Sequence, residues 1–226
     1  MKLFNLLLLT VFAFATTNIN AQGPTSVDVA TERLYMSAEA SKEKSALGSP
    51  YINEKFMPAT IKRYKNTMFL ARFNAYNGEL QVDLGNGKII ALDANKDYEL
   101  MFKATNKIYK SVSYISEDGV NKRGFLVVLE DQPDFKIYKK EHIEYIDAVP
   151  AATSYQRDKP AKFEREDDIY LIDFEGSITY LPTKKKDLIK KFPKQAKKIK
   201  SFMKDNDLNP KEEEELIQIV NHITTL

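Results

Sequence analysis

The hydrophobic and polar positions in the middle of the chain alternate in short runs, which is the pattern of half-buried strands. The clearest run is 67–76, which places Phe69 and Phe73 on one face of the expected strand together with two alanines. It ends at an Asn-Gly pair, 77–78, the dipeptide that most favours a two-residue hairpin turn because both of its residues tolerate positive φ. A second Asn-Gly pair, 86–87, follows one strand length later. We therefore expect a meander of consecutive antiparallel strands.

Turn residues continue to punctuate the chain about every 8 to 12 residues, which favours an all-β arrangement over βαβ units. Further strands are expected at 79–84, 88–92, 98–105, 108–116, 124–129, 135–139 and 142–147, with a last hairpin formed by 168–174 and 177–181. Residues 150–167 carry two prolines and many charges, so we expect a surface excursion within the same domain. The predicted fold class is mainly β: an antiparallel meander that forms a sandwich, an open barrel or a curved sheet over residues 50–182.

The hydrophobic period changes to that of amphipathic helices over residues 183–226. Pro193 indicates either a kinked helix or two helices, the second beginning at this proline. The final helix is expected to begin with Asn209 as N-cap, Pro210 at its first position and Glu212 as the capping-box partner. Two amphipathic helices should then pair as a C-terminal α-helical hairpin that covers one face or end of the sheet.

The first residues have the pattern of a secretory signal peptide. A single lysine is followed by an apolar run that is too short to span a bilayer and that ends in small and polar residues. We expect residues 1–21 to be removed and the protein to be periplasmic or secreted; a buried N-terminal helix is the alternative. Residues 22–49 predict a polar, weakly ordered leader or a short helix over 32–45.

Composition narrows the chemistry further. The 226 residues carry a net charge of +2 and include two histidines and no cysteine. Thiol chemistry, disulfide-linked partners and a lipid-modified cysteine are therefore excluded, and no further apolar run predicts stable membrane insertion. We expect no cofactor, and a soluble protein stabilised by packing alone.

Few residues suggest a metal or catalytic site. His142 and Glu144 would share one face of a strand, but His222 lies far away on the last helix, so we expect no metal centre. An Asp-x-Asn-x-Asp sequence at 93–97 lacks the glycine and the bidentate glutamate of a calcium loop, which favours a turn. The acidic residues at 164–168 leave a hydrolase with an unrecognised site as an alternative, but they are typical of a solvated linker.

The most prominent chemical feature is a run of ten lysines and one aspartate between residues 184 and 204, a local charge of +9. Such a face could bind a polyanion, either a phosphorylated glycolipid, a nucleic acid or an acidic polysaccharide. The alternative is a solvated helix face that is partly neutralised by the acidic start of the next helix, residues 212–215. Lysines at the first turn oppose the helix dipole, so helix stability does not explain them. The candidate binding residues are Lys190, Lys194, Lys197 and Lys198.

Several turn and core sequences resemble those of a family of exported β-rich proteins of Gram-negative bacteria. The segments that carry the resemblance are 48–51, 72–79, 87–92, 124–129, 188–204 and 208–216. The resemblance implies export and a β-rich fold, and it implies no activity and no site residues.

Together, the sequence predicts an exported, non-enzymatic binding or structural protein of the bacterial envelope or extracellular space. Its partner would be an envelope protein or a polyanion. This hypothesis carries the expectation that no cleft gathers three or more polar side chains. A separate hypothesis is self-association through an open sheet edge, because a meander leaves two unpaired edges.

Overall fold

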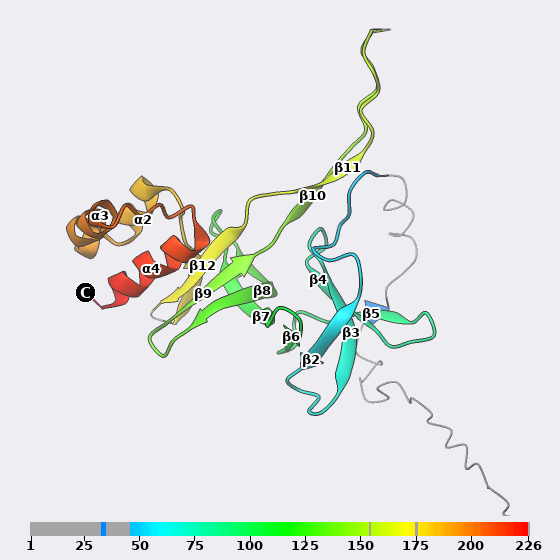
Figure 1. Ribbon diagram of the computed structural model, residues 1–226, viewed down its shortest axis with the longest axis horizontal. Helices are drawn as coiled ribbons and strands as arrows, with labels where there is room; N and C mark the ends of the chain where they lie inside the picture. The colour runs from blue at the N-terminus through cyan, green and yellow to red at the C-terminus, as the bar shows by residue number, and fades with distance from the viewer. Residues whose placement is uncertain (1–32, 35–45, 154, 175, 226) are drawn as a thin grey trace, which may run out of the picture.

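The computed structural model describes residues 33–34 and 46–225, apart from 154 and 175 (Figure 1). The expected signal peptide and most of the expected leader lie outside the described residues. Within the leader, β1 (Arg33–Leu34) pairs with a later strand, so a helix over 32–45 is wrong at these two residues. Leu47 also pairs with the chain near residue 162, through its backbone N–H to Ala161 and its carbonyl to Phe163.

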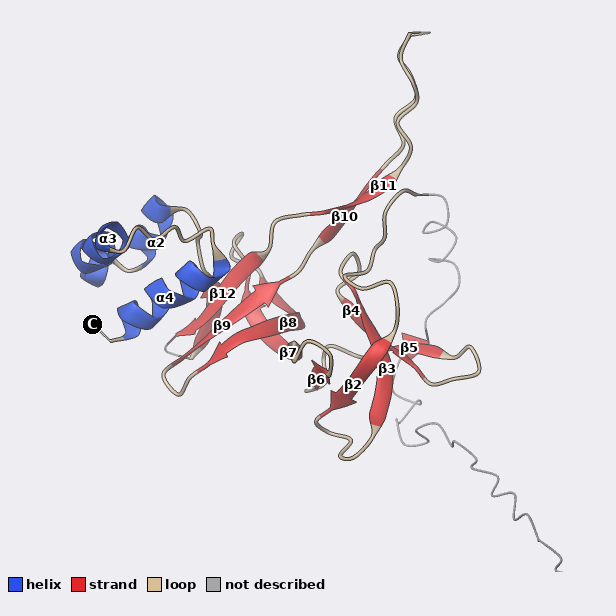
Figure 2. Cartoon of the chain, in the orientation of Figure 1, coloured by secondary structure: helices blue, strands red, loops and turns tan. Residues whose placement is uncertain are grey.

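The first half of the fold is an antiparallel sheet that follows the expected meander only in part (Figure 2). Its first strand, residues 57–61, was not predicted, and the last of its five strands along the chain pairs with this first one. The sheet consists of β2 (Met57–Ile61), β3 (Met68–Asn74), β4 (Glu79–Asp83), β5 (Ile89–Ala91) and β6 (Glu99–Phe102). The alternation predicted for β3 is confirmed, because Phe69 and Phe73 are both buried. These strands enclose the first hydrophobic core, with contributions from β7 and β8.

The two Asn-Gly pairs form different turns. Asn86 and Gly87 both have positive φ and lie between Gly85 and Lys88, whose backbone groups are hydrogen-bonded, so the predicted tight turn is confirmed there. The first pair differs: Asn74 is in register with Glu79, and four residues connect them. Only Gly78 of that pair has positive φ, so the predicted two-residue turn is wrong there. The side chain of Asn74 accepts hydrogen bonds from the backbone of the loop instead.

The second half closes into a five-stranded barrel. Its strands are β7 (Ile108–Ile115), β8 (Asn121–Asp131), β9 (Phe135–Lys140), β12 (Ile169–Phe174) and β13 (Ser177–Tyr180). Neighbours along the chain are antiparallel, but β13 pairs with β7 in parallel, with Thr179 opposite Ile115. An odd number of alternating strands makes the first and the last run in the same direction, so the closing pair must be parallel.

Closure corrects the expectation of a purely antiparallel meander with two open edges. The described sheet has the order β1-β5-β4-β3-β2-β6-β7-β13-β12-β9-β8, and β8 returns to β7. The strands at one end of the meander therefore pair with one another in the closed barrel, and this end of the described sheet has no open edge. The other end is β5, which the short strand β1 partly covers.

The expected surface excursion, 150–167, contributes one strand to a second, two-stranded sheet, whose other strand lies in the strand predicted at 142–147. Here β10 (Ile143–Ile146) pairs with β11 (Lys162–Arg165) to form an arm that extends away from the rest of the protein (Figure 1). Ile143 and Phe163 are buried in the first core, whereas Tyr155 near the tip is 99% exposed. The excursion therefore has an ordered base, because apolar side chains at its root complete the core of the first sheet.

The C-terminal segment contains three α-helices in the described residues, where the sequence predicted a hairpin of two. They are α2 (Lys185–Lys191), α3 (Ala196–Asp205) and α4 (Glu213–Thr224), with a 3-10 turn, η2 (Pro193–Gln195), between the first two. Pro193 opens that turn, which confirms the interpretation of separate helices. None of the described helices is long and apolar enough to cross a membrane.

The predicted start of α4 needs a correction. The helix begins at Glu213, and the side chain of Glu212 caps nothing. Asn209 accepts a hydrogen bond from the backbone of Lys211, and Glu215 accepts one from the backbone of Asn209 at 2.5 Å. Residues 209–212 form a turn before the helix. The acidic partner of Asn209 is therefore Glu215, one helical turn after the predicted Glu212.

The helices cover the outer face of the barrel on β9 and β12. Ile137 and Ile172 from these strands pack with Leu188, Ile199 and Leu216 from the three helices in a second hydrophobic core. A third cluster fills the barrel itself and consists of Val112, Tyr114, Leu126, Tyr138 and Leu171. Alternate residues of β9 and β12 thus face either the helices or the barrel interior.

Candidate functional site

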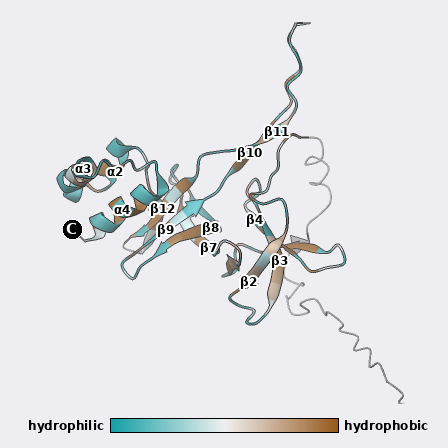
Figure 3. Ribbon diagram, in the orientation of Figure 1, coloured by the Kyte–Doolittle hydropathy of each residue, from teal (hydrophilic) through white to brown (hydrophobic). Residues whose placement is uncertain are grey.

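A cavity of about 660 Å³ lies between α2 and α3. Ile189 and Met203 contribute apolar surface to it, and Met203 is buried in the second core. Five lysines and one aspartate supply the remaining lining: Lys185, Lys186, Lys190, Lys200, Lys204 and Asp207. We call this cavity the lysine groove. Figure 3 shows that much of the α2–α3 segment around it is hydrophilic.

The lysines of the groove are poorly neutralised. Lys190 pairs with Asp187 at 3.3 Å on an exposed surface. Within the described residues no other lysine of the groove forms an ion pair. Long lysine stems can cover apolar surface while their ammonium groups stay in water, so the groove combines an apolar floor with a positive rim.

No ion pair of the described residues joins the acidic start of α4 to Lys200 or Lys204, the lysines that the alternative interpretation expected it to neutralise in part. Glu213 instead contacts Lys139 of β9 at 2.6 Å and accepts a hydrogen bond from Tyr170. The carboxylate of Glu215 is engaged with the backbone of residue 209. These two acidic side chains therefore hold the start of α4 on the barrel and in its turn.

The four lysines named from the sequence are not gathered around one cavity. Lys190 lines the lysine groove, whereas Lys194 lines a separate cavity of about 340 Å³ beside β12 and β13. Lys197 and Lys198 are exposed on α3 and line neither cavity. The helical pattern of the sequence predicts the buried face of this segment, because Leu188, Ile199 and Met203 all lie in the second core. It does not predict which lysines meet, because that depends on how α2 packs against α3 across the 3-10 turn.

Sequence reasoning missed four of the five groove lysines as binding candidates. Lys185 and Lys186 carried a signal, because they occupy the first turn of α2, where positive charge opposes the helix dipole. Lys200 and Lys204 lie on α3 and carried no local signal. Their meeting with α2 depends on how the two helices pack.

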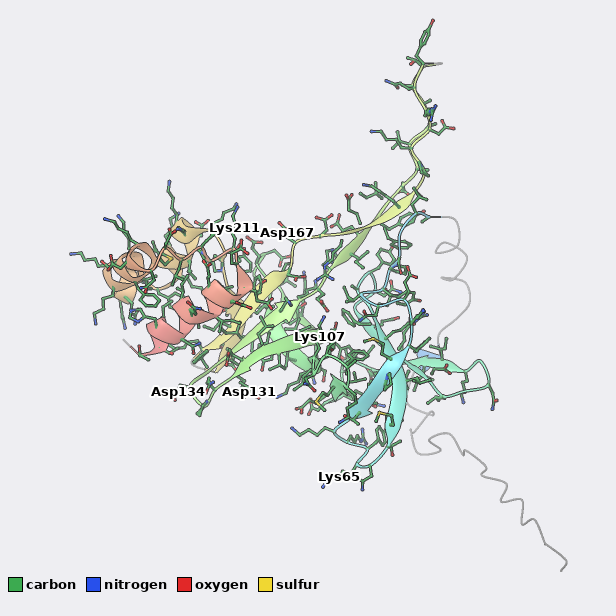
Figure 4. The ribbon with its side chains drawn as sticks, in the orientation of Figure 1. Lys65, Lys107, Asp131, Asp134, Asp167 and Lys211 are labelled. Carbon is green, nitrogen blue, oxygen red and sulfur yellow. The ribbon has the colours of Figure 1, made fainter. Side chains whose placement is uncertain are left out.

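A second polar cluster is buried where the barrel meets the first sheet and the arm. The side chain of Glu141 is 2% exposed and accepts hydrogen bonds from Tyr109 and from Lys107, the latter at 2.9 Å. Arg165 of the arm lies 3.3 Å from Glu141 and 2.7 Å from Asp168. Figure 4 labels Lys107 between the barrel and the first sheet.

The hydrogen bonds and charges of this cluster explain the shifted pKa values of Glu141 and Tyr109. Burial acts to raise the pKa of Glu141, but hydrogen bonds from Tyr109 and Lys107 and the charges of Lys107 and Arg165 outweigh burial and lower it. Burial and the adjacent Glu141 raise the pKa of the Tyr109 phenol far above its ordinary value. Every charged member has an opposite partner, which is the arrangement of a structural network that joins the parts of the fold.

The structure does not bring the histidines together. His142 lies 3.5 Å from Glu144, while the ring of His222 stacks on Phe202 with centroids 3.9 Å apart. In the described part of the chain no three His, Asp or Glu side chains form a group that could hold a metal ion. At 93–97, Asp93 accepts a hydrogen bond from the backbone of Asn95, so the expected turn is confirmed.

The acidic residues at 164–168 are distributed along the chain that leaves the arm. Glu164 pairs with Lys162 at 2.6 Å, and Asp168 belongs to the buried cluster. Glu166 and Asp167 are exposed.

One mouth of the barrel does gather several polar side chains around a cavity of about 430 Å³, including Ser116, Asp118, Lys122 and Lys140. The expectation that no cleft would do so is therefore wrong.

Comparison of the chain with protein-family models, with curated proteins and with solved structures found no significant match. The resemblance to exported proteins of Gram-negative bacteria stays a prediction.

Proposed function

We propose that the protein is an exported binding protein of the bacterial envelope or extracellular space, and that its lysine groove binds an anionic amphiphile such as a phosphorylated lipid. The observation that carries this proposal is the combination of an apolar floor, Ile189 and Met203, with five lysines and a single aspartate around it. Export rests on the signal-peptide pattern of the first 21 residues.

The apolar floor favours an amphiphile over a simple polyanion. A cavity of about 660 Å³ lies within the range of about 300 to 1,000 Å³ that is typical of small-molecule sites. Nucleic-acid sites usually add exposed aromatic rings on which bases stack, and none of the lining residues is aromatic. A ligand with an acyl chain and a phosphate would satisfy both the floor and the rim.

The placement of the lysines supports a role in binding. The positive charges of Lys185 and Lys186 oppose the dipole of α2 at its first turn. This costs about 0.3 to 1 kcal/mol for each lysine. In the described structure neither forms an ion pair that would offset this cost. Asp187 supplies one negative charge in the same turn but pairs with Lys190, so a bound anion would add counter-charge for Lys185 and Lys186.

The test compares two short-chain lipids that share an apolar body, dihexanoyl phosphatidic acid and dihexanoyl phosphatidylcholine. Isothermal titration calorimetry with the full chain should show binding of the phosphatidic acid that weakens as salt is raised, because salt screens exposed charges. The phosphatidylcholine should bind at least about tenfold more weakly, since it lacks net charge.

Two triple variants with the same change in charge separate the groove from the rest of the lysine run. The groove variant carries Lys→Glu changes at positions 186, 190 and 200, and the control carries them at 194, 197 and 198. We expect the groove variant to lose affinity for phosphatidic acid about tenfold or more and the control to lose much less. Equal losses would refute the groove as the site, and heparin binding without phosphatidic acid binding would favour a simple polyanion site.

Ile189→Ser tests the apolar floor separately. This change should weaken phosphatidic acid binding while leaving any binding of inorganic phosphate unchanged, because only the amphiphile has an apolar part to lose contact. If phosphatidic acid binds equally well to Ile189→Ser, the floor plays no part and the amphiphile proposal fails.

A further inference from the structure

The cavity at the barrel mouth is separate from the lysine groove and has a different construction. Its lining includes Tyr114 and Leu171, which are 7% and 1% exposed and belong to the cluster that fills the barrel. Lys122 and Lys140 line it as well. Mouths of β-barrels are common positions for small-ligand sites, and about 430 Å³ is an ordinary size for one.

The two carboxylates of this mouth already have partners. Asp118 accepts a hydrogen bond from the hydroxyl of Ser116 at 2.5 Å and lies 3.6 Å from Lys122. Glu117 is hydrogen-bonded to Tyr180, and burial together with this carboxylate raises the pKa of the Tyr180 phenol. Ordinary pairs thus account for the acidic groups and for Lys122.

Lys140 is different. It follows Tyr138 by two residues on β9, so both side chains stand on the inner side of the sheet. Lys140 is half-buried, and no carboxylate of the described residues is within ion-pair distance of it. Burial, and to a smaller degree the charge of Lys122, lowers the pKa of its amine, while the charge of Asp118 acts weakly in the opposite direction. Partial burial without an ion-pair partner therefore disfavours the charged form of this amine.

We infer that the barrel mouth is a binding site for a small organic acid, whose carboxylate or phosphate pairs with Lys140 and whose apolar body lies against Tyr114 and Leu171. The acid supplies the counter-charge that the fold omits. An aromatic or short aliphatic body adds affinity mainly because it leaves water itself, since Tyr114 and Leu171 have little exposed surface left to cover. This inference uses no residue of the lysine groove and stands independently of the proposed function.

The binding test uses benzoate and phenyl phosphate as probes and benzyl alcohol as a neutral probe of similar shape. Backbone amide shifts of the full chain, followed by NMR, should move at Tyr114, Lys140 and Leu171 with either anion. Lys140→Met should weaken both anions about tenfold or more, because one fully formed charge pair is lost. Lys103→Met, an exposed lysine outside this cavity, is the matched control and should bind as the wild type does.

A stability measurement keeps the test decisive. Because the ammonium of Lys140 has no partner, Lys140→Met should raise the melting temperature of the ligand-free protein, as expected when a binding residue is kept at the expense of stability. A clear fall in melting temperature would show that Lys140 has a structural role and would overturn the inference. Unchanged anion affinity in Lys140→Met would also overturn the inference. So would benzyl alcohol binding as tightly as benzoate, or NMR shift changes that concentrate on α2 and α3.

Discussion

Replacement of Glu141 by leucine should destabilise the junction between the barrel, the first sheet and the arm. Glu141 is almost completely buried and accepts hydrogen bonds from Tyr109 and Lys107, with Arg165 also close to it. Leucine has a similar volume, so the main change is the loss of the carboxylate. Tyr109 and Lys107 would then keep their polar groups in a buried setting without their acceptor.

The magnitude follows from the exposure of the partners. Removing one member of a buried ion pair costs about 3 to 5 kcal/mol. The side chains of Lys107 and Arg165 are 26% and 45% exposed, so water replaces part of the lost interaction. We therefore expect a loss near the lower limit, about 3 kcal/mol. For a chain of this length that corresponds to a fall in melting temperature of roughly 6 to 12 °C.

The assay is urea unfolding followed by circular dichroism, with Glu144→Gln as a control. Glu144 is also in this region, but its side chain is 58% exposed, so its replacement should change the free energy of unfolding by no more than about 0.5 kcal/mol. A loss below about 1 kcal/mol for Glu141→Leu at neutral pH would refute the reasoning, because it would mean that the buried carboxylate is not needed by its partners.

The same residue predicts a dependence on pH. The pKa of Glu141 is lowered in the folded protein, so its contribution to stability is fully present above its ordinary pKa of 4.5 and is lost as the pH falls through the lowered value. Wild type should therefore lose stability in acid more steeply than Glu141→Leu, and the two unfolding curves should approach each other. A constant difference in the free energy of unfolding between wild type and Glu141→Leu across acid pH would contradict the lowered pKa of Glu141.

Three further predictions concern other parts of the fold. Gly48→Ala should destabilise the protein more than Gly87→Ala, since both have positive φ but an added Cβ at Gly48 would meet the carbonyl oxygen of Phe163 at 2.6 Å; equal melting temperatures would contradict this. Leu216→Ala should cost about 3 kcal/mol in urea unfolding, because the side chain is fully buried between α4 and the barrel, and a loss under about 1 kcal/mol would show that α4 packs loosely. Because the pKa of Tyr109 is raised in the folded protein, its contribution to the free energy of unfolding is present below its ordinary pKa of 10.0 and is lost as the pH rises above that value. Wild type should therefore lose stability between about pH 9 and 11 more steeply than Tyr109→Phe.

Local features were predictable from the sequence because they depend on neighbouring residues. The alternation around Phe69 and Phe73 determines which face of β3 is buried, and the Asn86-Gly87 pair supplies the two positive φ angles of its turn. Pro193 cannot continue a helix, which separates α2 from α3. The mainly β class with C-terminal helices follows from such signals taken together.

The candidate sites depended on contacts between distant segments. Nothing near Thr179 in the sequence indicates that it pairs with Ile115, yet this pair closes the barrel and creates the mouth in which Lys140 stands. The lysine run predicted a charged surface, but the packing of α2 against α3 selected which lysines meet.

The sequence by itself therefore determined the strand faces, several turns, the helical C-terminus and the excess of positive charge, since each is set by residues within a few positions of one another. Only the tertiary structure decided that the meander closes in parallel, that Glu141 joins three parts of the fold, and that Lys140 has no counter-ion among the described residues. These properties arise from pairings across long stretches of chain, where many alternative partners have similar local patterns and only simultaneous packing distinguishes them.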